Sequence, residues 1–150
     1  NVTHCQAIKP NFERGNKIMS QSIDKILNDE VLSLRVLKGL VENSFDSILI
    51  TDASARAKII YANKAFKTLT GHSPAAVVGK TPKILQGPST DKKVIARLAA
   101  CLGKGTSFEG KAVNYKKDGT PFIMYWRVIP AKVGKNTKVW IAIQREGSSI

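Results

Sequence analysis

The sequence contains little of what disulfide frameworks, metal centres and membrane spans require. It has two cysteines, Cys5 and Cys101, and two histidines, His4 and His72. Two cysteines are too few for a disulfide framework, which favours a protein of the reducing cytoplasm. The histidines lack partner ligands at the spacing of metal sites, so the sequence predicts no metal centre. No apolar run approaches the roughly 20 residues that a membrane-spanning helix needs.

The residue sets of familiar catalytic machinery are also missing. We find no Ser/His/Asp or Cys/His set, no Gly-rich phosphate loop and no spaced pair of carboxylates. The acids Asp52, Asp91 and Asp118 fall at expected turns or helix caps, where such residues are common. The sequence therefore predicts no catalytic residues and no enzyme activity.

Acidic residues are scarce and unevenly placed. The chain has 24 Lys and Arg against 11 Asp and Glu, for a formal net charge of +13. Residues 1–52 carry a net charge of −1, whereas residues 53–150 carry +14. Such a basic body attracts acidic partners, which makes a basic nucleic-acid-binding domain the alternative function. The lysines are scattered and no recognition helix is evident, so nucleic acid is not the favoured partner.

Apolar residues at helical spacing predict an amphipathic helix across residues 19–44, after a tail at residues 1–18. Two neighbouring rows of apolar residues follow this helix: Leu27, Val31, Leu34, Leu37 and Val41, and beside them Leu32, Val36 and Leu40. Such a wide apolar face can cover the domain of the same chain or pair with a second copy, as in a short coiled coil. Both interpretations remain open.

Residues 45–148 are expected to form one domain. In chain order the expected elements are strands at 47–52 and 58–62, helices at 63–71, 73–79 and 90–105, and strands at 106–117, 120–131 and 137–146. Asn63 and Ser73 are typical helix N-caps, and Asp118-Gly119 marks a tight hairpin. The order predicts an α+β fold, in which short helices cover one face of a five-stranded antiparallel sheet.

Four motifs of this domain occur in a recognisable order. They are "YANKAFKTLTGHSPAAVVGK", "ILQGPSTD", "NYKKDGTPF" and "IAIQ". The first resembles the PAS domain family, and the other three resemble its flavin-binding light-oxygen-voltage (LOV) subclass. The resemblance covers about residues 46–148 and implies a PAS fold. It also implies a regulatory sensor and dimerisation module, joined to an effector outside this chain such as a kinase or a cyclic-dinucleotide enzyme.

The segment "GKTPKILQ" departs from the LOV pattern at its reactive position. In the LOV subclass a cysteine within "G-x-N-C-R-F-L-Q" reacts with the flavin under blue light, and Pro82 stands at that position here. Because proline has no sulfur, the resemblance implies that this chain is not competent for cysteinyl-flavin photochemistry. Thr81 is expected to cap a helix whose first turn contains Pro82. Cys101 is interpreted as a small buried apolar residue.

The resemblance implies a site for FMN or FAD that this chain keeps in part. Gln86, Asn114 and Gln144 retain the polar residues of the pattern that contact the flavin ring and ribityl edge. Lys83 replaces a phosphate-binding arginine, so it keeps the charge and loses the fork geometry. Ala99 stands where many members carry a second phosphate-binding arginine. The implied site is therefore a weakened one.

Strand alternation places Met124 and Trp126 on the face that carries the polar residues of this site. These two side chains can fill the space of a flavin ring, or they can form a wall that stacks on a planar ligand. Two alternatives therefore stay open. The chain is a weak flavin or redox sensor in which Gln144 reports the state of the flavin, or it is a module without a flavin.

Overall fold

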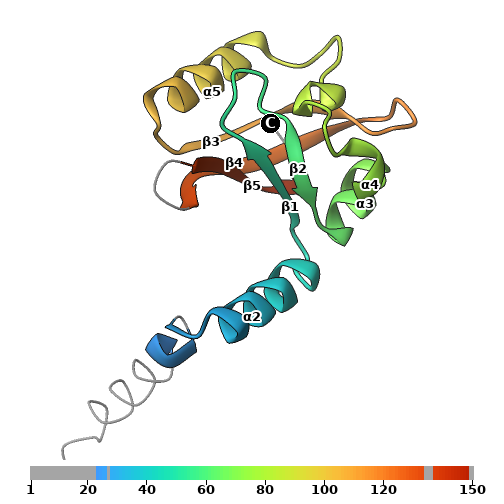
Figure 1. Cartoon of the computed structure of the whole chain (residues 1–150). Coiled ribbons are helices and arrows are strands. Elements are labelled where there is room, and N and C mark those ends of the chain that lie inside the picture. Colours follow the sequence, from blue (N-terminus) through green and yellow to red (C-terminus); the bar gives the residue numbers. More distant parts are fainter. Residues whose placement is uncertain (1–22, 27, 134–136, 149–150) are drawn as a thin grey trace, which may run out of the picture. The chain divides into compact units, whose positions relative to one another are not determined.

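A five-stranded antiparallel sheet forms the centre of residues 41–150 in this computed structural model (Figure 1). The structure describes residues 23–26, 28–133 and 137–148, so the expected tail and Leu27 lie outside the described residues. The strands are β1 (Ser47–Asp52), β2 (Ile59–Ala62), β3 (Phe108–Tyr115), β4 (Pro121–Val133) and β5 (Thr137–Glu146). They pair in the order β2-β1-β5-β4-β3. The predicted α+β fold is confirmed.

The helices of residues 41–150 lie between β2 and β3 in the chain and cover one face of the sheet (Figure 1). They are α3 (Lys64–Thr70), α4 (Pro74–Val77), the 3₁₀ helix η1 (Pro82–Leu85) and α5 (Lys92–Lys104). Asn63 and Ser73 cap α3 and α4 as predicted. Thr81 occupies the N-cap position of η1 and Pro82 lies in its first turn, as predicted, but the expected capping bond is absent because the Thr81 side chain accepts no hydrogen bond there.

The face of the sheet beneath the helices carries the core. Strand alternation correctly places Met124 and Trp126 on the same face as Asn114 and Gln144. The buried residues of this inner face are Ala112, Asn114, Phe122, Met124, Trp126, Val128, Trp140, Ala142 and Gln144. The helices and the edge strand add Phe66, Ile59, Val77 and Leu85, each at most 1% exposed. Cys101 packs against this core from α5 and is partly rather than fully buried, because α5 lies at the edge of the cluster.

Helix α2 (Glu30–Glu42) is shorter than the helix expected across residues 19–44. The helical run breaks at Asp29, whose carboxylate accepts a hydrogen bond from the Leu32 amide at 2.9 Å and so caps α2. No residue of α2 is buried, and Val31, Leu34 and Leu40 are 61%, 59% and 67% exposed. The apolar side chains of α2 from Val31 to Leu40 are therefore exposed.

Candidate ligand site

A cavity of about 190 Å³ lies between the inner face of the sheet, η1, α5 and the β1–β2 hairpin. Its walls are largely apolar and include Leu49, Leu85, Ile95, Leu98, Leu102 and Val128. Six residues predicted to contact a ligand all line it: Lys83, Gln86, Asn114, Met124, Trp126 and Gln144. The fold thus gathers into one cavity residues that are spread over η1, the loop after it and three strands.

Asn114 carries the least satisfied polar group of this cavity. The residue is 2% exposed, and no hydrogen-bond partner for its Nδ2 atom is present in the part of the chain that the structure describes. Leaving a buried donor unpaired costs about 1–3 kcal/mol, and native proteins do so rarely. Because Asn114 lines the cavity, a molecule bound there can supply the missing acceptor.

Gln144 presents a second buried amide to the cavity, and it is 3% exposed. Its Oε1 atom accepts a hydrogen bond from the Ser47 hydroxyl at 3.0 Å, which leaves the amide NH₂ as the donor for a ligand. Gln144 pairs with Ser47 on β1 and with Trp126 on β4. Our sequence analysis missed Ser47, although its place in the alternation Ser47-Leu49-Thr51 puts it on the inner face.

Met124 and Trp126 line the cavity without filling it. Each is 4% exposed, and the Trp126 ring lies against the Phe108 ring with centroids 5.4 Å apart. The Arg97 guanidinium covers Phe108 at 4.5 Å, so the wall behind Trp126 is packed. The cavity is smaller than the roughly 300–1,000 Å³ of pockets for drug-sized ligands. A planar tricyclic ring therefore fits only if side chains such as the flexible Met124 change rotamer.

Pro82, which the resemblance places at the cysteine position of the LOV pattern, is among the residues that line the cavity. The free cysteine of the described residues, Cys101, lies on α5 and is absent from the lining. Within the described ranges, no thiol therefore borders the cavity.

The β1–β2 hairpin forms one lip of the cavity with Ala55, Arg56 and Ala57, and our sequence analysis missed all three. Asp52 holds this hairpin: its Oδ1 atom accepts bonds from the Ser54 hydroxyl at 2.6 Å, the Lys58 amide at 2.9 Å and the Ser54 amide at 3.2 Å. The bond from the Ser54 hydroxyl, aided by these amides, lowers the pKa of Asp52. The lip is thus a defined turn.

Ala57 adopts a left-handed backbone with φ of +47° in this lip. That conformation costs an L-residue about 1–2 kcal/mol, and glycine or asparagine usually occupies it. The expected strands on either side predicted a hairpin here, whereas no sequence signal indicated the left-handed conformation of Ala57. Its consequence is a small side chain at the cavity edge beside Arg56.

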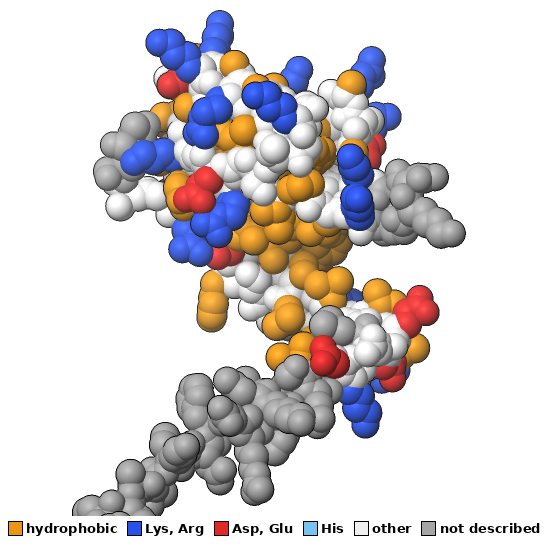
Figure 2. Space-filling model, turned by 90° about the vertical axis from the view of Figure 1, so that its left-hand side faces the viewer, with side chains coloured by type: hydrophobic (Ala, Val, Ile, Leu, Met, Phe, Trp, Pro, Cys, Tyr) orange, Lys and Arg blue, Asp and Glu red, His pale blue; other side chains and the backbone are white. Residues whose placement is uncertain are grey.

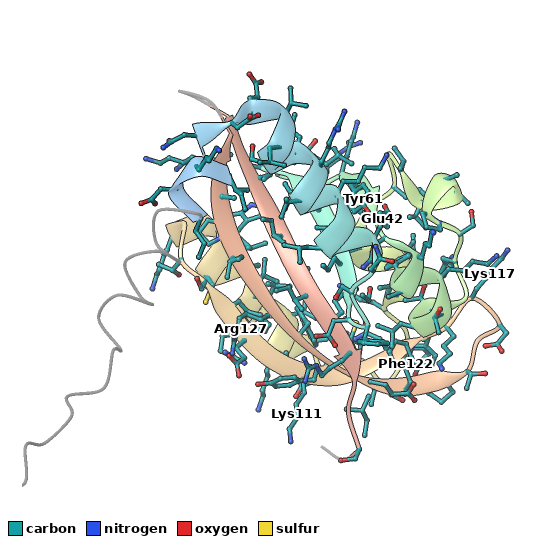
Figure 3. All side chains as sticks on the ribbon, turned by 90° about the horizontal axis from the view of Figure 1, so that it is seen from below. Glu42, Tyr61, Lys111, Lys117, Phe122 and Arg127 are labelled. Atoms are coloured by element: carbon teal, nitrogen blue, oxygen red, sulfur yellow. The ribbon has the colours of Figure 1, made fainter. Side chains whose placement is uncertain are left out.

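The outer face of the sheet carries a separate apolar surface (Figure 2). Its members are half-buried isoleucines from the three central strands: Ile48, Ile50, Ile129, Ile141 and Ile143. They are neighbours in register, since Ile48 pairs with Ile143 and Ile141 pairs with both Ile50 and Ile129. At one border of this outer isoleucine surface the Tyr61 hydroxyl donates a hydrogen bond to the Glu42 carboxylate (Figure 3).

Two other kinds of site find no support. Among the described residues, no group of three or more His, Cys, Asp or Glu side chains is placed to hold a metal ion. The same residues include no helix with the length and apolar character that crossing a membrane requires.

The chain is similar to sensor domains of light-responsive proteins. The PAS domain model matches residues 46–148. Phototropin-2 from Oryza sativa subsp. japonica is 38% identical over 97 residues, which are 64% of this chain and 11% of that protein. Other curated relatives are likewise matched over small shares of their length, 21% and 9% in two further cases.

Solved structures of LOV domains share the fold. A light-oxygen-voltage domain in work on a flavin analogue is 28% identical, with a TM-score of 0.68, over 76% of this chain and 85% of that one. The LOV domain from the Erythrobacter litoralis EL346 blue-light activated histidine kinase is 30% identical, with a TM-score of 0.63. The match covers 67% of this chain and 94% of that domain.

Proposed function

The chain belongs to the PAS domain family, and we propose that it is the sensor module of a larger signalling protein and binds a flavin weakly. In this proposal the module is cytoplasmic, has no catalytic activity of its own and acts on an effector, such as a kinase, outside residues 1–150. The small share of phototropin-2 that the chain spans, and its similarity to a domain of a histidine kinase, support this arrangement.

The unpaired Asn114 Nδ2 atom is the observation that carries the ligand proposal. It lies in an apolar cavity next to a second amide, that of Gln144, and with two cations, Arg56 and Lys83, in the same lining. A flavin mononucleotide matches this set, because its planar ring has hydrogen-bonding edges and its tail ends in a phosphate. The flavin analogue studied in a similar LOV domain supports the same ligand class.

Gln144 is the residue that we propose to report the state of the ligand. A bound flavin supplies oxidation and reduction, and the hydrogen-bonding character of its ring edge differs between the two states. The Gln144 amide can rotate to match that edge, since the Ser47 hydroxyl that it contacts can either donate or accept. A rotation would reach β1 through Ser47 and β4 through Trp126, the register partners of Gln144.

Photochemistry through a cysteine is not part of the proposal. Pro82 lines the cavity without a sulfur atom, and Cys101 is absent from the lining. The module is therefore proposed to respond to the oxidation state or the presence of flavin, and not to form a thiol bond under light.

Self-association is the second element of the proposed function. Val31, Leu34, Leu37 and Leu40 of α2 are between 57% and 67% exposed, and the Phe45 side chain is fully exposed. These four residues of α2 recur every three positions, and exposed apolar residues along one side of a helix are typical of a pairing surface. We propose that α2 and the outer isoleucine surface take part in a homodimer.

Nucleic-acid binding is not proposed. Phe108, Trp126 and Trp140 are buried on the inner face of the sheet, so they are unavailable for stacking on bases.

An absorption spectrum tests the ligand proposal. The chain is expressed in flavin-rich cells, then mixed with excess FMN or FAD and desalted. We expect a structured blue band to remain, and Asn114→Ala and Gln144→Leu to weaken or shift it. Asn28→Ala, a change of the same type at an exposed residue of the N-terminal segment, serves as the control. Absence of the band under every condition would contradict flavin binding and favour a relay module without a flavin.

A further inference from the structure

The charged residues of the cavity lining are all cations. Arg56 comes from the β1–β2 hairpin and Lys83 from η1, and no Asp or Glu of the described residues lines the cavity. Both cations are exposed, whereas the amides Asn114 and Gln144 of the same cavity are buried on the sheet. The cavity therefore combines an enclosed side with amide donors and an open side with positive charge.

Neither cation is engaged by the protein. Arg56 and Lys83 have no ion pair or side-chain hydrogen bond to any of the residues that the structure describes. Two other arginines of the domain are paired, Arg127 with Glu109 at 2.7 Å and Arg145 with Asp46 at 2.6 Å. Exposed lysines such as Lys67 also have no ion pair among the described residues, but they lie outside the cavity lining. Two unpaired cations beside a cavity with an unpaired buried donor indicate that an anionic group of a ligand is expected there.

The backbone that carries Arg56 is fixed by hydrogen bonds, and the side chains beside it are small. Asp52 fixes the turn through its bonds to Ser54 and Lys58. Ala55 and Ala57 flank Arg56, and Ala99 of α5 also lines the cavity with only a methyl group. No bulky side chain of these three positions competes for the space into which the guanidinium can reach.

We propose that Arg56 and Lys83 form an anion clamp that selects a phosphorylated ligand, with Arg56 as the residue that determines this specificity. The inference rests on the proposed function and extends it, because it predicts preference for flavin mononucleotide over riboflavin. A guanidinium binds two phosphate oxygens at once, whereas an ammonium acts as a point charge. Arg56 of the hairpin thus supplies the guanidinium group, with its two parallel N–H donors, that Lys83 lacks.

Paired affinities for FMN and riboflavin test the clamp. Binding of each flavin to residues 1–150 is followed by fluorescence quenching in low salt. We expect the wild type to bind FMN about ten- to a hundredfold more tightly than riboflavin. Arg56→Ala should remove roughly tenfold of this preference and leave riboflavin affinity unchanged, and Arg56→Lys should restore part of it. The preference should shrink as salt rises, because the clamp is open to solvent.

Lys67→Ala is the matched control, since Lys67 is an exposed cation of α3 outside the cavity lining. This variant should keep the full preference for FMN. Equal wild-type affinities for the two flavins, or a preference that survives Arg56→Ala, would overturn the clamp and leave flavin binding standing. Failure of the wild type to bind either flavin would overturn both proposals.

Discussion

Helix α2 and the inner face of the sheet differ in the kind of group that lacks a contact. The inner face buries its large apolar side chains and leaves one polar atom, Asn114 Nδ2, without a partner among the described residues. Helix α2 buries no residue at all, and its apolar rows are open to solvent. The first region lacks a hydrogen-bond acceptor, and the second lacks apolar cover.

This difference shows which kind of partner each region can use. An enclosed cavity with buried amides gains from a small polar molecule that satisfies them. An exposed apolar stripe gains from another apolar surface, because burial stabilises by about 25 cal/mol for each Å² removed from water. The comparison thus separates ligand binding from self-association, and each can be disturbed without the other.

The strongest test of the comparison removes one large apolar side chain from α2 and one, Phe66 of α3, from the core that packs on the inner face of the sheet. Phe66 is 0% exposed, and Phe66→Ala should lower the unfolding free energy by about 3–5 kcal/mol, because the substitution leaves a cavity in the core. Leu37 is 57% exposed, and Leu37→Ala should lower the unfolding free energy by no more than about 0.5 kcal/mol. Urea unfolding at low protein concentration measures both.

In an association assay the larger effect of the two should come from Leu37→Ala. Leu37→Ala should weaken dimerisation in analytical ultracentrifugation, since its side chain is part of the proposed pairing surface. A large loss of monomer stability from Leu37→Ala would break the comparison, because it would show that α2 is covered within one chain.

A substitution of Asn63 tests how the end of α2 is held next to β1 and α3. Its Oδ1 atom accepts from the Ile48 and Phe66 amides, and its Nδ2 atom donates to the Val41 and Asp46 carbonyls at 2.9 and 3.0 Å. The residue is 0% exposed. Asn63→Ala should therefore cost about 2–4 kcal/mol, since buried backbone groups lose their partners. Hydrogen exchange should rise at residues 41–48.

Ser73→Ala is the control for Asn63, because Ser73 is also an N-cap and makes a single capping bond at its surface site. This variant should cost about 1 kcal/mol in the same urea assay. Equal losses for the two variants would mean that the bonds from Asn63 to Val41 and Asp46 add nothing to its role as a cap.

Most of the fold could be predicted because its signals are local. The resemblance placed Asn114 and Gln144 on the inner face, and period-two alternation placed Met124 and Trp126 beside them; all four are buried there. Asn63 and Ser73 carried cap signals that the structure confirms. The sequence also placed Thr81 correctly at the start of η1, but it could not tell that the Thr81 side chain makes no capping bond.

The rest of the site depends on contacts between distant segments. Arg56 lines the cavity from a turn in which Ala57 is left-handed, and alanine gives no sequence signal for that conformation. Ser47 becomes the partner of Gln144, 97 residues away, through strand pairing. The cavity volume depends on how many side chains pack together. The sequence therefore predicted that Met124 and Trp126 border the site, but not how much space they leave between them.

Asn114→Leu sharpens the account of the inner face, because stability and binding should change in opposite directions. Replacing the unpaired amide by an apolar side chain of similar size should raise the unfolding free energy of the ligand-free protein by about 1–2 kcal/mol. Flavin affinity should fall about tenfold in the same variant. Thermal unfolding with and without FMN measures both, and a loss of stability without ligand would show that Asn114 is satisfied in the free protein.

The smallest effect is expected at Tyr61, which joins β2 to the end of α2 through Glu42. Burial, and then the bond to Glu42, raises the pKa of Tyr61 from 10.0 to about 12. A raised pKa means that the folded protein holds this proton more tightly than the unfolded chain. The resulting stability is complete below pH 10 and is lost as pH rises toward 12. Tyr61→Phe should cost about 1 kcal/mol at pH 7.

The pH dependence separates the Tyr61 bond from simple packing. Because phenylalanine cannot ionise, the stability difference between wild type and Tyr61→Phe should shrink between pH 10 and pH 12. Urea midpoints of both proteins across this range provide the measurement, and the subtraction removes the titration of lysines that the two share. A difference that stays constant across the range would assign the effect of Tyr61 to its ring, and the bond to Glu42 would then contribute nothing to holding the end of α2.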